Sequence, residues 1–488
     1  MMEETNDLIE QRIKKLDELK ALGVEPFGGS FDIKDYAEDL INKHGSTAKE
    51  ELEASPVQCV IAGRIIMMRD FGKAAFAHVQ DSTARIQVYF RKDILNEKYS
   101  VVKKLDIGDI IGISGKLFRT KTHELTIEVD DFKFLTKSLR PLPEKWHGLK
   151  DIETRYRQRY VDLIVNPEVK ETFKKRSTII KAVRDFLETK GFIEVETPVL
   201  ETTTGGAEAR PFVTHHNALD MDVYLRISVG ELWQKRLMVA GLPKTFEIGR
   251  VFRNEGMSAE HAQDYTAMEF YEAFKDYEAG MEMITDLYRT IADEVYGTRM
   301  FSIKGFDIDL DKEWEKYDYC ALMQKEYGLD PLDETADWAR VLSERHIPFE
   351  EHADRGRLVD TAWKQVRKTL SGPGFLINVP VYMEPLAKKS AKDPRVVERF
   401  QVVLAGSENG KGFSELNDPI DQSERFAQQG QLRAAGDEEA QMPDAEFVEA
   451  LEYGMPPAFG FGVSERLFSF LEGVSIREGQ IFPLLRPR

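Results

Sequence analysis

The chain has 488 residues, of which 42% are hydrophobic and 31% charged, which is typical of soluble globular proteins with two or three domains. No run of about 18 apolar residues occurs, so we expect no membrane partner. The net charge of −18 argues against indiscriminate nucleic-acid binding, so we expect no DNA partner, while a local basic face can still bind RNA. Only Cys59 and Cys320 are cysteines, and the N-terminus lacks the apolar centre of a secretion signal. Both features predict a cytoplasmic protein without a cysteine-built zinc site.

The first segment is predicted to be helical. Residues 3–22 carry apolar side chains at helical spacing, and "GVEPFGG" ends this helix with Gly23, Pro26 and Gly28. A second helical stretch runs to about residue 54. We therefore assign residues 1–56 to an N-terminal helical extension.

Residues 57–138 change to five short alternating runs separated by turn residues. This pattern predicts a small closed β-barrel, and the oligonucleotide-binding (OB) barrel is the commonest such fold that binds RNA. Phe76 and Gln87 would lie on neighbouring strands, as an aromatic ring to stack on a base and an amide to read its edge. Taken alone, an aromatic residue in a barrel strand is more often part of the core.

The Pro-rich stretch "LRPLPEKWHGL" marks a domain boundary, and the basic segment after it suggests a hinge over residues 139–170. Residues 171–488 read as one large α/β region with antiparallel strands. In it, "STIIKAVRDFLETKGF" is predicted to be a helix closed by Gly191, and "FIEVETPVL" a strand that stops at Pro198.

Residues 244–274 read as a long β-hairpin around a polar loop. Alternation predicts that Glu247, Arg253 and Glu255 lie on one side of the first strand, and that Glu269 and Tyr271 share a face of the second. An arginine at a strand end, followed by a polar loop, suits binding of a polyphosphate and an adenine. A surface hairpin with cross-strand ion pairs is the other reading.

Two further segments carry candidate chemistry. Near the C-terminus a Gly-rich strand is followed by Glu465, Arg466 and an apolar helix, an arrangement that can hold the end of a triphosphate. The stretch "AGSENGKGFSELND" places Glu408 and Glu415 seven positions apart, as a metal site or as an ordinary surface loop. The sequence contains neither a P-loop nor a GxGxxG entry to a βαβ unit, so parallel-sheet nucleotide folds are not indicated.

Three ordered segments, "GFIEVETP", "FRNEG…H…YTAMEFY" and "GFGVSERLF", resemble the signature motifs of class II aminoacyl-tRNA synthetases. With the barrel in front and "GFSELNDPIDQ" in place, the chain closely resembles the bacterial-type lysyl-tRNA synthetases from about residue 57 to its end. The resemblance implies an α+β fold. Its parts are a five-stranded OB-fold anticodon-binding barrel (57–138) and a catalytic domain (171–488) on an antiparallel sheet of six or seven strands flanked by helices. It also implies a homodimer with Pro198 near the interface.

The function implied by the resemblance is activation of L-lysine with ATP to lysyl-adenylate and pyrophosphate, followed by transfer to tRNA(Lys), with Mg²⁺ as cofactor. The family's catalytic arginines correspond to Arg253 at the α-phosphate and Arg466 at the γ-phosphate, and Tyr265 would stack on adenine. The implied sites are ATP binding by Arg253, Asn254, Glu255, His261, Tyr265, Glu408 and Arg466; lysine binding by Gly206, Glu231, Glu269, Tyr271, Phe413 and Glu415; anticodon binding by Arg64, Phe76 and Gln87; and magnesium binding by Glu408 and Glu415.

Four positions depart from the family pattern. Lys411 replaces a usual asparagine at the amino-acid pocket, where its ammonium would repel lysine unless it turned away to pair with Glu408 or a phosphate. Gln401 replaces a glutamate usual near ATP, one extra residue precedes Glu231, and the last motif is one residue shorter, which puts Ser464 near the active face. Two alternatives follow: a paralogue that activates another amine-bearing amino acid or loads another acceptor, and a catalytically silent RNA-binding protein.

Overall fold

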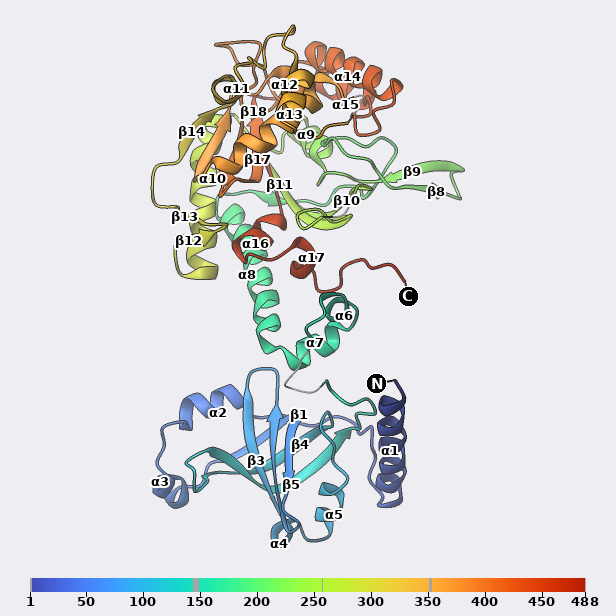
Figure 1. Ribbon diagram of the computed structural model, residues 1–488, viewed down its shortest axis with the longest axis vertical. Helices are drawn as coiled ribbons and strands as arrows, with labels where there is room; N and C mark the ends of the chain where they lie inside the picture. Colours follow the sequence, from blue (N-terminus) through green and yellow to red (C-terminus); the bar gives the residue numbers. More distant parts are fainter. Residues whose placement is uncertain (1, 144–148, 257, 351–352, 488) are drawn as a thin grey trace. The chain divides into compact units, whose positions relative to one another are not determined.

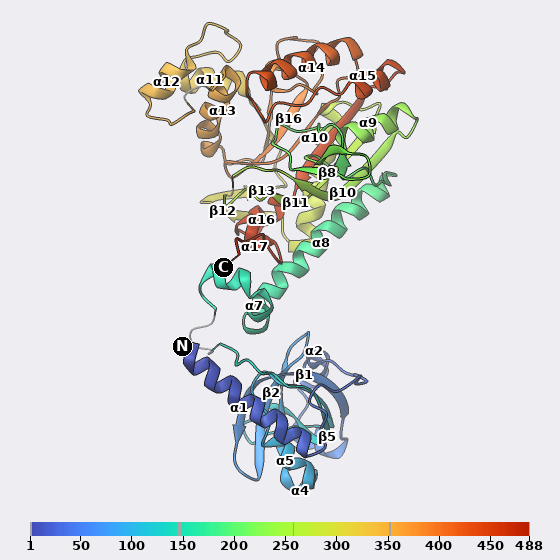
Figure 2. The same ribbon diagram turned by 90° about the vertical axis from the view of Figure 1, so that its right-hand side faces the viewer.

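A computed structural model describes residues 2–143, 149–256, 258–350 and 353–487 of the chain. It contains two compact units, which divide between Ile152 and Glu153 and are each described by themselves. Figures 1 and 2 show their elements. Residues 144–148 of the expected hinge lie outside the described part. Among the described helices, none is both long and apolar enough to cross a bilayer.

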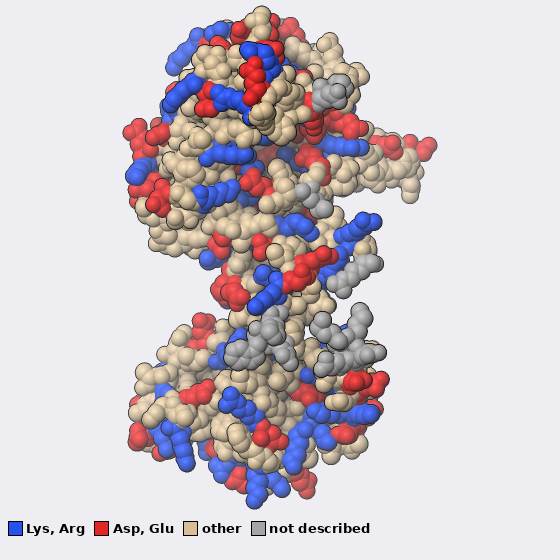
Figure 3. All heavy atoms as spheres, viewed as in Figure 1, with Lys and Arg blue, Asp and Glu red and all other residues tan. Residues whose placement is uncertain are grey.

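The N-terminal unit is a closed five-stranded barrel with the strand order β1-β2-β3-β5-β4, as predicted. Alternate residues of each strand point inward, and Ile61, Val79, Val88, Ile113 and Ile127 are fully buried in the barrel core. On the face shown in Figure 3, basic and acidic side chains are interspersed over this unit. The strands are β1 (Gln58–Asp70), β2 (Ala74–Gln80), β3 (Arg85–Arg91), β4 (Ile110–Arg119) and β5 (Leu125–Thr136).

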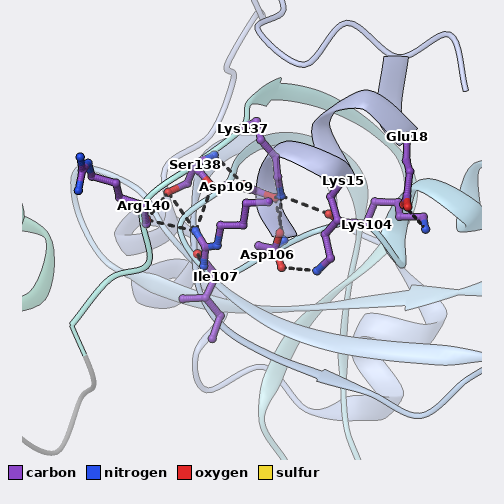
Figure 4. A network of polar contacts seen from close by, with 10 residues as sticks. Lys15, Glu18, Lys104, Asp106, Ile107, Asp109, Lys137, Ser138 and Arg140 are labelled. Carbon is purple, nitrogen blue, oxygen red and sulfur yellow. Dashed lines mark hydrogen bonds and ion pairs between the residues drawn. The ribbon is translucent and has the colours of Figure 1, made fainter. Parts of the chain in front are cut away.

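Helices of the expected extension lie beside the barrel. The second helical stretch is two short helices, and the first helix is tied to the barrel by an ion-pair network (Figure 4). In this network the buried ammonium of Lys137 lies 2.6 Å from Asp106 and 2.8 Å from Asp109, and Lys15 of the first helix lies 2.5 Å from Asp106. The helices of this unit are α1 (Met2–Ala21), α2 (Ala37–His44), α3 (Lys49–Ala54), α4 (Lys92–Leu95), α5 (Tyr99–Val102) and the 3-10 turn η1 (Asn96–Lys98).

The second unit is built on an eight-stranded sheet in the order β14-β15-β16-β17-β18-β11-β10-β6. The six central strands pair antiparallel, as the resemblance implied, whereas β14 and β6 pair parallel with their neighbours, so the sheet is mixed at both edges. The strands are β6 (Ile193–Glu194), β10 (Lys244–Phe252), β11 (Asp264–Ala273), β14 (Glu315–Asp318), β15 (Gly374–Ile377), β16 (Arg399–Leu404), β17 (Ser407–Ser414) and β18 (Ala458–Ser464).

Helices α8 and α10 cover one face of this sheet. Their buried apolar residues form a common core with Phe246, Phe270, Phe400, Phe459 and Phe461 of the strands. The remaining elements of the unit are α6 (Ile152–Arg157), α7 (Arg159–Val165), α8 (Pro167–Thr189), α9 (Glu231–Val239), α10 (Tyr277–Ile291), η2 (Ala292–Tyr296), α11 (Tyr319–Tyr327), α12 (Trp338–Glu344), α13 (Arg355–Val366), η3 (Arg367–Thr369), η4 (Val381–Met383), α14 (Pro419–Ala434), α15 (Ala445–Glu452), α16 (Arg466–Leu471), α17 (Ile476–Gly479), and the small strands β7 (Leu200–Glu201), β8 (Val213–His216), β9 (Met221–Leu225), β12 (Met300–Ile303) and β13 (Phe306–Asp309).

The segment "FIEVETPVL" is not the continuous strand that its alternation predicted. Only Ile193–Glu194 and Leu200–Glu201 pair with other strands. Between them Thr197 donates from its backbone N–H and its hydroxyl to Glu247, at 3.0 and 2.6 Å. Because Thr197 makes these hydrogen bonds with the side chain of Glu247, its backbone does not pair with a neighbouring strand.

Candidate active site

A cavity of about 610 Å³ lies in the second unit, over strands β11, β17 and β18. The glycines of β18 form part of its wall, while the alternating Phe459 and Phe461 belong to the core shared with α10. The cavity size is within the range typical of small-molecule sites. Most residues that the sequence singled out for ATP and lysine line this one space.

Strand register arranges the cavity floor in two rows. Lys411, Gly462 and Glu269 are directly opposite one another across β17, β18 and β11. In the next row on the same face, Phe413 and Tyr271 lie on either side of Gly460. The glycine in the middle of each row lets the flanking side chains lie close to the backbone of β18, because a Cβ at Gly460 would be 2.5 Å from the Tyr271 ring and one at Gly462 3.2 Å from Glu269. The two glycines are therefore required for this packing at the cavity floor.

One end of the cavity is acidic. Glu269 accepts from the backbone N–H of Val229 at 2.8 Å and from the Tyr271 hydroxyl at 3.0 Å, so the predicted common face of Glu269 and Tyr271 is confirmed. Burial, with a further contribution from Glu231, raises the pKa of Glu269 to about 7. Burial also raises the pKa of Glu415 to about 8, although a neighbouring lysine opposes the shift. Such an end is suited to a cationic ligand, which would stabilise both carboxylates.

That neighbouring lysine is Lys235 of α9, which the sequence analysis did not single out. Its ammonium lies 2.7 Å from Glu231 and 2.5 Å from Glu415. Burial lowers the pKa of Lys235, but the two carboxylates raise it by more, so the ammonium stays charged. The position of Lys235 four residues after Glu231 on one helix is the signal that could have found it.

The other end of the cavity is cationic. Arg253 follows β10 directly, with its guanidinium 5.7 Å from the ring centre of Tyr265. Arg466 begins α16 and pairs with Glu260. Two arginines on separate elements, both lining the cavity, are suited to the two ends of a polyphosphate.

The polar loop between β10 and β11 also reaches the cavity. Glu255 and His261 line it, and burial followed by the charge of Arg466 lowers the pKa of His261. Burial raises the pKa of Glu255. Asn254, by contrast, is exposed and is not among the lining residues.

Glu247 does not lie with Arg253 and Glu255 as alternation predicted. Strand β10 ends at Phe252, so its period does not extend to the two later residues. Glu247 is buried and forms a 2.5 Å ion pair with Arg226. It therefore supports the wall instead of facing a ligand.

The joint magnesium site of Glu408 and Glu415 remains a prediction. Both residues line the cavity, and Gly410 between them has a φ of 108°, so β17 is not regularly extended over this stretch. Glu415 is fully buried beside Lys235, while Glu408 accepts from the indole N–H of Trp363 at 2.7 Å. Among the described side chains, no group of three or more His, Cys, Asp or Glu could surround a metal. A magnesium ion shared by Glu408 and Glu415 would therefore take its other ligands from phosphates and water.

Lys411 lines the cavity, and its ammonium pairs with Glu384 at 3.1 Å, not with Glu408. Glu384 also accepts an ion pair from Arg399 at 2.9 Å, and Arg399 donates to Gln401 at 2.6 Å. Burial raises the pKa of Glu384, but Arg399 and Lys411 lower it by more, so this carboxylate is ionised. Lys411 therefore has a counter-ion within the protein, Glu384. The sequence analysis missed it because Glu384 lies 27 residues away along the chain.

The two segments whose lengths depart from the family pattern both form regular structure, one in strand β18 and the other before helix α9. The shortened strand β18 pairs in an unbroken register with β11, from Ala458 to Ser464. Gly230, directly before Glu231, has a φ of 67° at the start of α9. Ser464 and Gly206 both line the cavity.

In the barrel, Phe76 and Gln87 lie on the paired strands β2 and β3. Phe76 stacks on Tyr89, with ring centres 4.3 Å apart. Arg64 is opposite Gln80, about 13 Å of strand from Phe76, and donates to the Gly108 carbonyl at 2.7 Å. The structure therefore brings together the predicted aromatic and amide but not the predicted arginine.

Comparison with known proteins extends this picture. Residues 151–486 match the family described as tRNA synthetases class II (D, K and N), and residues 59–135 match the OB-fold nucleic acid binding domain. The lysine–tRNA ligase of Halalkalibacterium halodurans is 47% identical over 99% of this chain and 97% of its own length. That of Carboxydothermus hydrogenoformans is 46% identical over 100% and 99%, and that of Bacillus subtilis 45% over 100% and 98%. The chain belongs to the class II tRNA synthetase family, and within it to the bacterial-type lysyl-tRNA synthetases.

Proposed function

We propose that the protein is an ATP-using lysine–tRNA ligase, which forms lysyl-adenylate and pyrophosphate and then transfers the lysyl group to tRNA(Lys). The observation that carries this proposal is the single cavity with an acidic and a cationic end. An amino acid with a charged side chain fits the first end, and the triphosphate of ATP fits the second. The curated relatives, which match over nearly the whole chain, are named for the same reaction.

The acidic end would hold lysine. Moving an ammonium out of water is costly unless carboxylates surround it, and Glu231, Glu269 and Glu415 supply three. Tyr271 and Phe413 would pack along the aliphatic part of the side chain. Gly206 lines the cavity next to this pocket and would lie near the α-amino group.

The cationic end would hold ATP. Arg253 would bind the α-phosphate and the attacking carboxylate together, and Arg466 would bind the γ-phosphate. Tyr265 would stack on the adenine, with Glu255 and His261 at the nucleotide's edge. No covalent enzyme nucleophile is required, because positioning and stabilisation of the negative charge on phosphorus lower the barrier. Asn254, which is exposed, would contact the nucleotide from outside the cavity wall.

Magnesium would be held beside the phosphates by Glu408 and Glu415, and the Glu408 carboxylate is oriented by Trp363. When bound there, the ion would neutralise phosphate charge. The indole N–H of Trp363 fixes the orientation of the Glu408 carboxylate, and a guanidinium nitrogen of Arg367 lies 3.7 Å from one of its oxygens.

The barrel would bind the anticodon of tRNA(Lys). Phe76 and Tyr89 form a ready stacking surface, and Gln87 donates to Glu124 at 2.8 Å while accepting from Thr126 at 2.8 Å. These two contacts fix the orientation of the amide, so that it can present a defined edge to a base. Arg64 would contribute positive charge farther along the strand.

We also propose a homodimer in the cytoplasm. Near Pro198, the apolar residues Val199, Leu200 and Val213 are exposed by 43% to 58%, and Leu200 and Val213 lie on strands β7 and β8 of one small sheet. Exposed apolar residues close together in a catalytic unit are typical of a surface covered by another chain.

Charging of tRNA(Lys) with labelled lysine tests the proposal. We expect ATP-dependent charging by the full chain, and loss of more than about a hundredfold in Arg253→Gln, because one charge-stabilising group is removed. Replacing Phe76 by alanine should reduce charging without reducing adenylate formation. Absence of charging with intact adenylate formation would indicate another acceptor, and absence of both would support the silent RNA-binding alternative.

A further inference from the structure

The amino-acid pocket already contains an ammonium of the protein's own. Lys235 is 1% exposed, and its Nζ lies between carboxylate oxygens of Glu231 and Glu415. The same Nζ lies 5.4 Å from the ring centre of Phe413 and 5.8 Å from that of Tyr271. All four of these neighbours are residues proposed above to hold the substrate.

The charges around Lys235 explain why it is there. Glu231, Glu269 and Glu415 would together bring three negative charges into a buried space. Lysine as substrate brings two ammonium groups, one on its side chain and one on its α-carbon, and its carboxylate is directed to Arg253. With Lys235 added, three ammonium groups match three carboxylates. Without it, one buried carboxylate would lack a partner, which is strongly unfavourable.

The two oxygens of Glu415 have different surroundings. Its Oε2 is the atom nearest Lys235. Among the described residues, Oε1 has no hydrogen-bond partner, and Oε2 has none beyond its ion pair with Lys235. A Cβ at Gly460 would lie 2.1 Å from Oε1, so this oxygen packs directly against the backbone of Gly460 in the cavity wall.

We propose that Lys235 is a positioning residue for the amino-acid substrate, a fixed counter-ion that holds Glu231 and Glu415 so that the pocket accepts one side-chain ammonium. This inference rests on the proposed function. It assigns to Lys235 no contact with the reacting atoms. Its loss should therefore weaken lysine binding more than it slows the chemical step or weakens ATP binding.

The first test replaces Lys235 by methionine, which keeps the length of the side chain and removes its charge. Lysine-dependent ATP–pyrophosphate exchange should show the KM for lysine raised by about tenfold or more, with the KM for ATP within about twofold. The matched control is Lys137→Met, which removes another fully buried lysine that bridges two carboxylates, but in the barrel unit. The control should leave the KM for lysine unchanged. An unchanged or lowered KM in Lys235→Met would overturn the inference.

The second test separates charge from packing and does not depend on one variant folding well. In Lys235→Ala the missing atoms correspond to n-propylammonium, and 1-propanol is a neutral molecule of similar shape. We expect n-propylammonium, but not 1-propanol, to lower the KM for lysine of this variant, with circular dichroism confirming a folded chain. Equal rescue by both, or by neither, would overturn the role as counter-ion. Wild-type exchange is measured alongside, so that no exchange with lysine in the wild type counts against the proposed function itself.

Discussion

Glu269 and Glu415 lie in a buried environment that disfavours the charged forms of their carboxyl groups. Burial is the largest cause in both cases, and it raises their pKa values to about 7 and about 8. A carboxyl group with a raised folded-state pKa stabilises the fold at pH values below its unfolded value. That contribution is lost as the pH rises through the folded-state value. A bound ammonium offsets this loss.

This linkage predicts that lysine binds more tightly as pH rises from 6.5 to 8. At the lower pH both carboxyl groups are largely protonated, and binding must displace their protons, while the side chain of free lysine remains charged throughout. We expect the dissociation constant for lysine, measured by calorimetry, to fall by about tenfold. The rise in melting temperature caused by lysine should likewise be larger at pH 8. In Glu415→Gln the upper part of this dependence should disappear, and a flat profile in the wild type would contradict the account.

Lys411 is held by Glu384, so its removal should matter little. Its side chain is 44% exposed, and Glu384 keeps its pair with the buried Arg399 when Lys411 is lost. We expect Lys411→Met to change the free energy of unfolding by less than about 1 kcal/mol and the KM for lysine by less than about threefold. Arg399→Met is the contrasting variant, since it breaks a buried pair and should cost about 3 kcal/mol in a urea titration. A tenfold change of KM in Lys411→Met would mean that Lys411 contacts the substrate.

At the scale of elements, the hairpin β10–β11 could be predicted from the sequence because alternation, turn residues and polar loop all agree there. The segment after α8 could not, since the contact of Thr197 with Glu247 joins positions 50 residues apart. The spacing of Glu408 and Glu415 is visible in the sequence, but the distance between them depends on the strand that joins them. For the same reason the ion pairs of Lys235 and Lys411 could not be predicted from the sequence, because they depend on the tertiary structure.

The start of α9 depends on Gly230, the residue directly before Glu231. Its φ of 67° is strained for other residues, and a Cβ there would lie 2.1 Å from the Thr197 hydroxyl oxygen. We expect Gly230→Ala to lower the free energy of unfolding by about 2 kcal/mol or more and to raise the KM for lysine, because Glu231 is displaced.

Gly241→Ala is the matched control for this prediction. It also has positive φ, at 92°, but nothing lies within 4 Å of the added Cβ. We expect it to cost only about 1 kcal/mol, and to leave the KM for lysine unchanged. Equal effects of the two variants would show that the contact with Thr197 is unimportant.

At the scale of the whole molecule, the sequence predicted both units, because the barrel and the synthetase motifs occupy separate stretches of chain. The five-stranded barrel and the antiparallel centre of the large sheet are confirmed. The parallel edge strands could not be predicted, because β14 and β6 are too short to show a pattern.

The exposed apolar residues near Pro198 predict the assembly state. Sedimentation analysis should give a mass of about twice the 55.9 kDa of one chain. A charged residue in this surface, as in Leu200→Asp, should shift the chain toward monomer, since an unpaired charge would be buried at the interface. Phe71→Asp changes a residue of the barrel unit that is 67% exposed, and should leave the dimer intact. A monomeric wild type would contradict the proposal.

Amino-acid-dependent ATP–pyrophosphate exchange tests the central claim most directly, because it requires both ends of the cavity and no tRNA. Lysine would be compared with ornithine, β-lysine, arginine and the remaining standard amino acids, at fixed ATP and magnesium. The account predicts exchange driven by lysine, with the other amino acids weaker by about tenfold or more. Exchange driven by a different amino acid would contradict the assignment of the acidic pocket, and no exchange with any of them would contradict the enzymatic function.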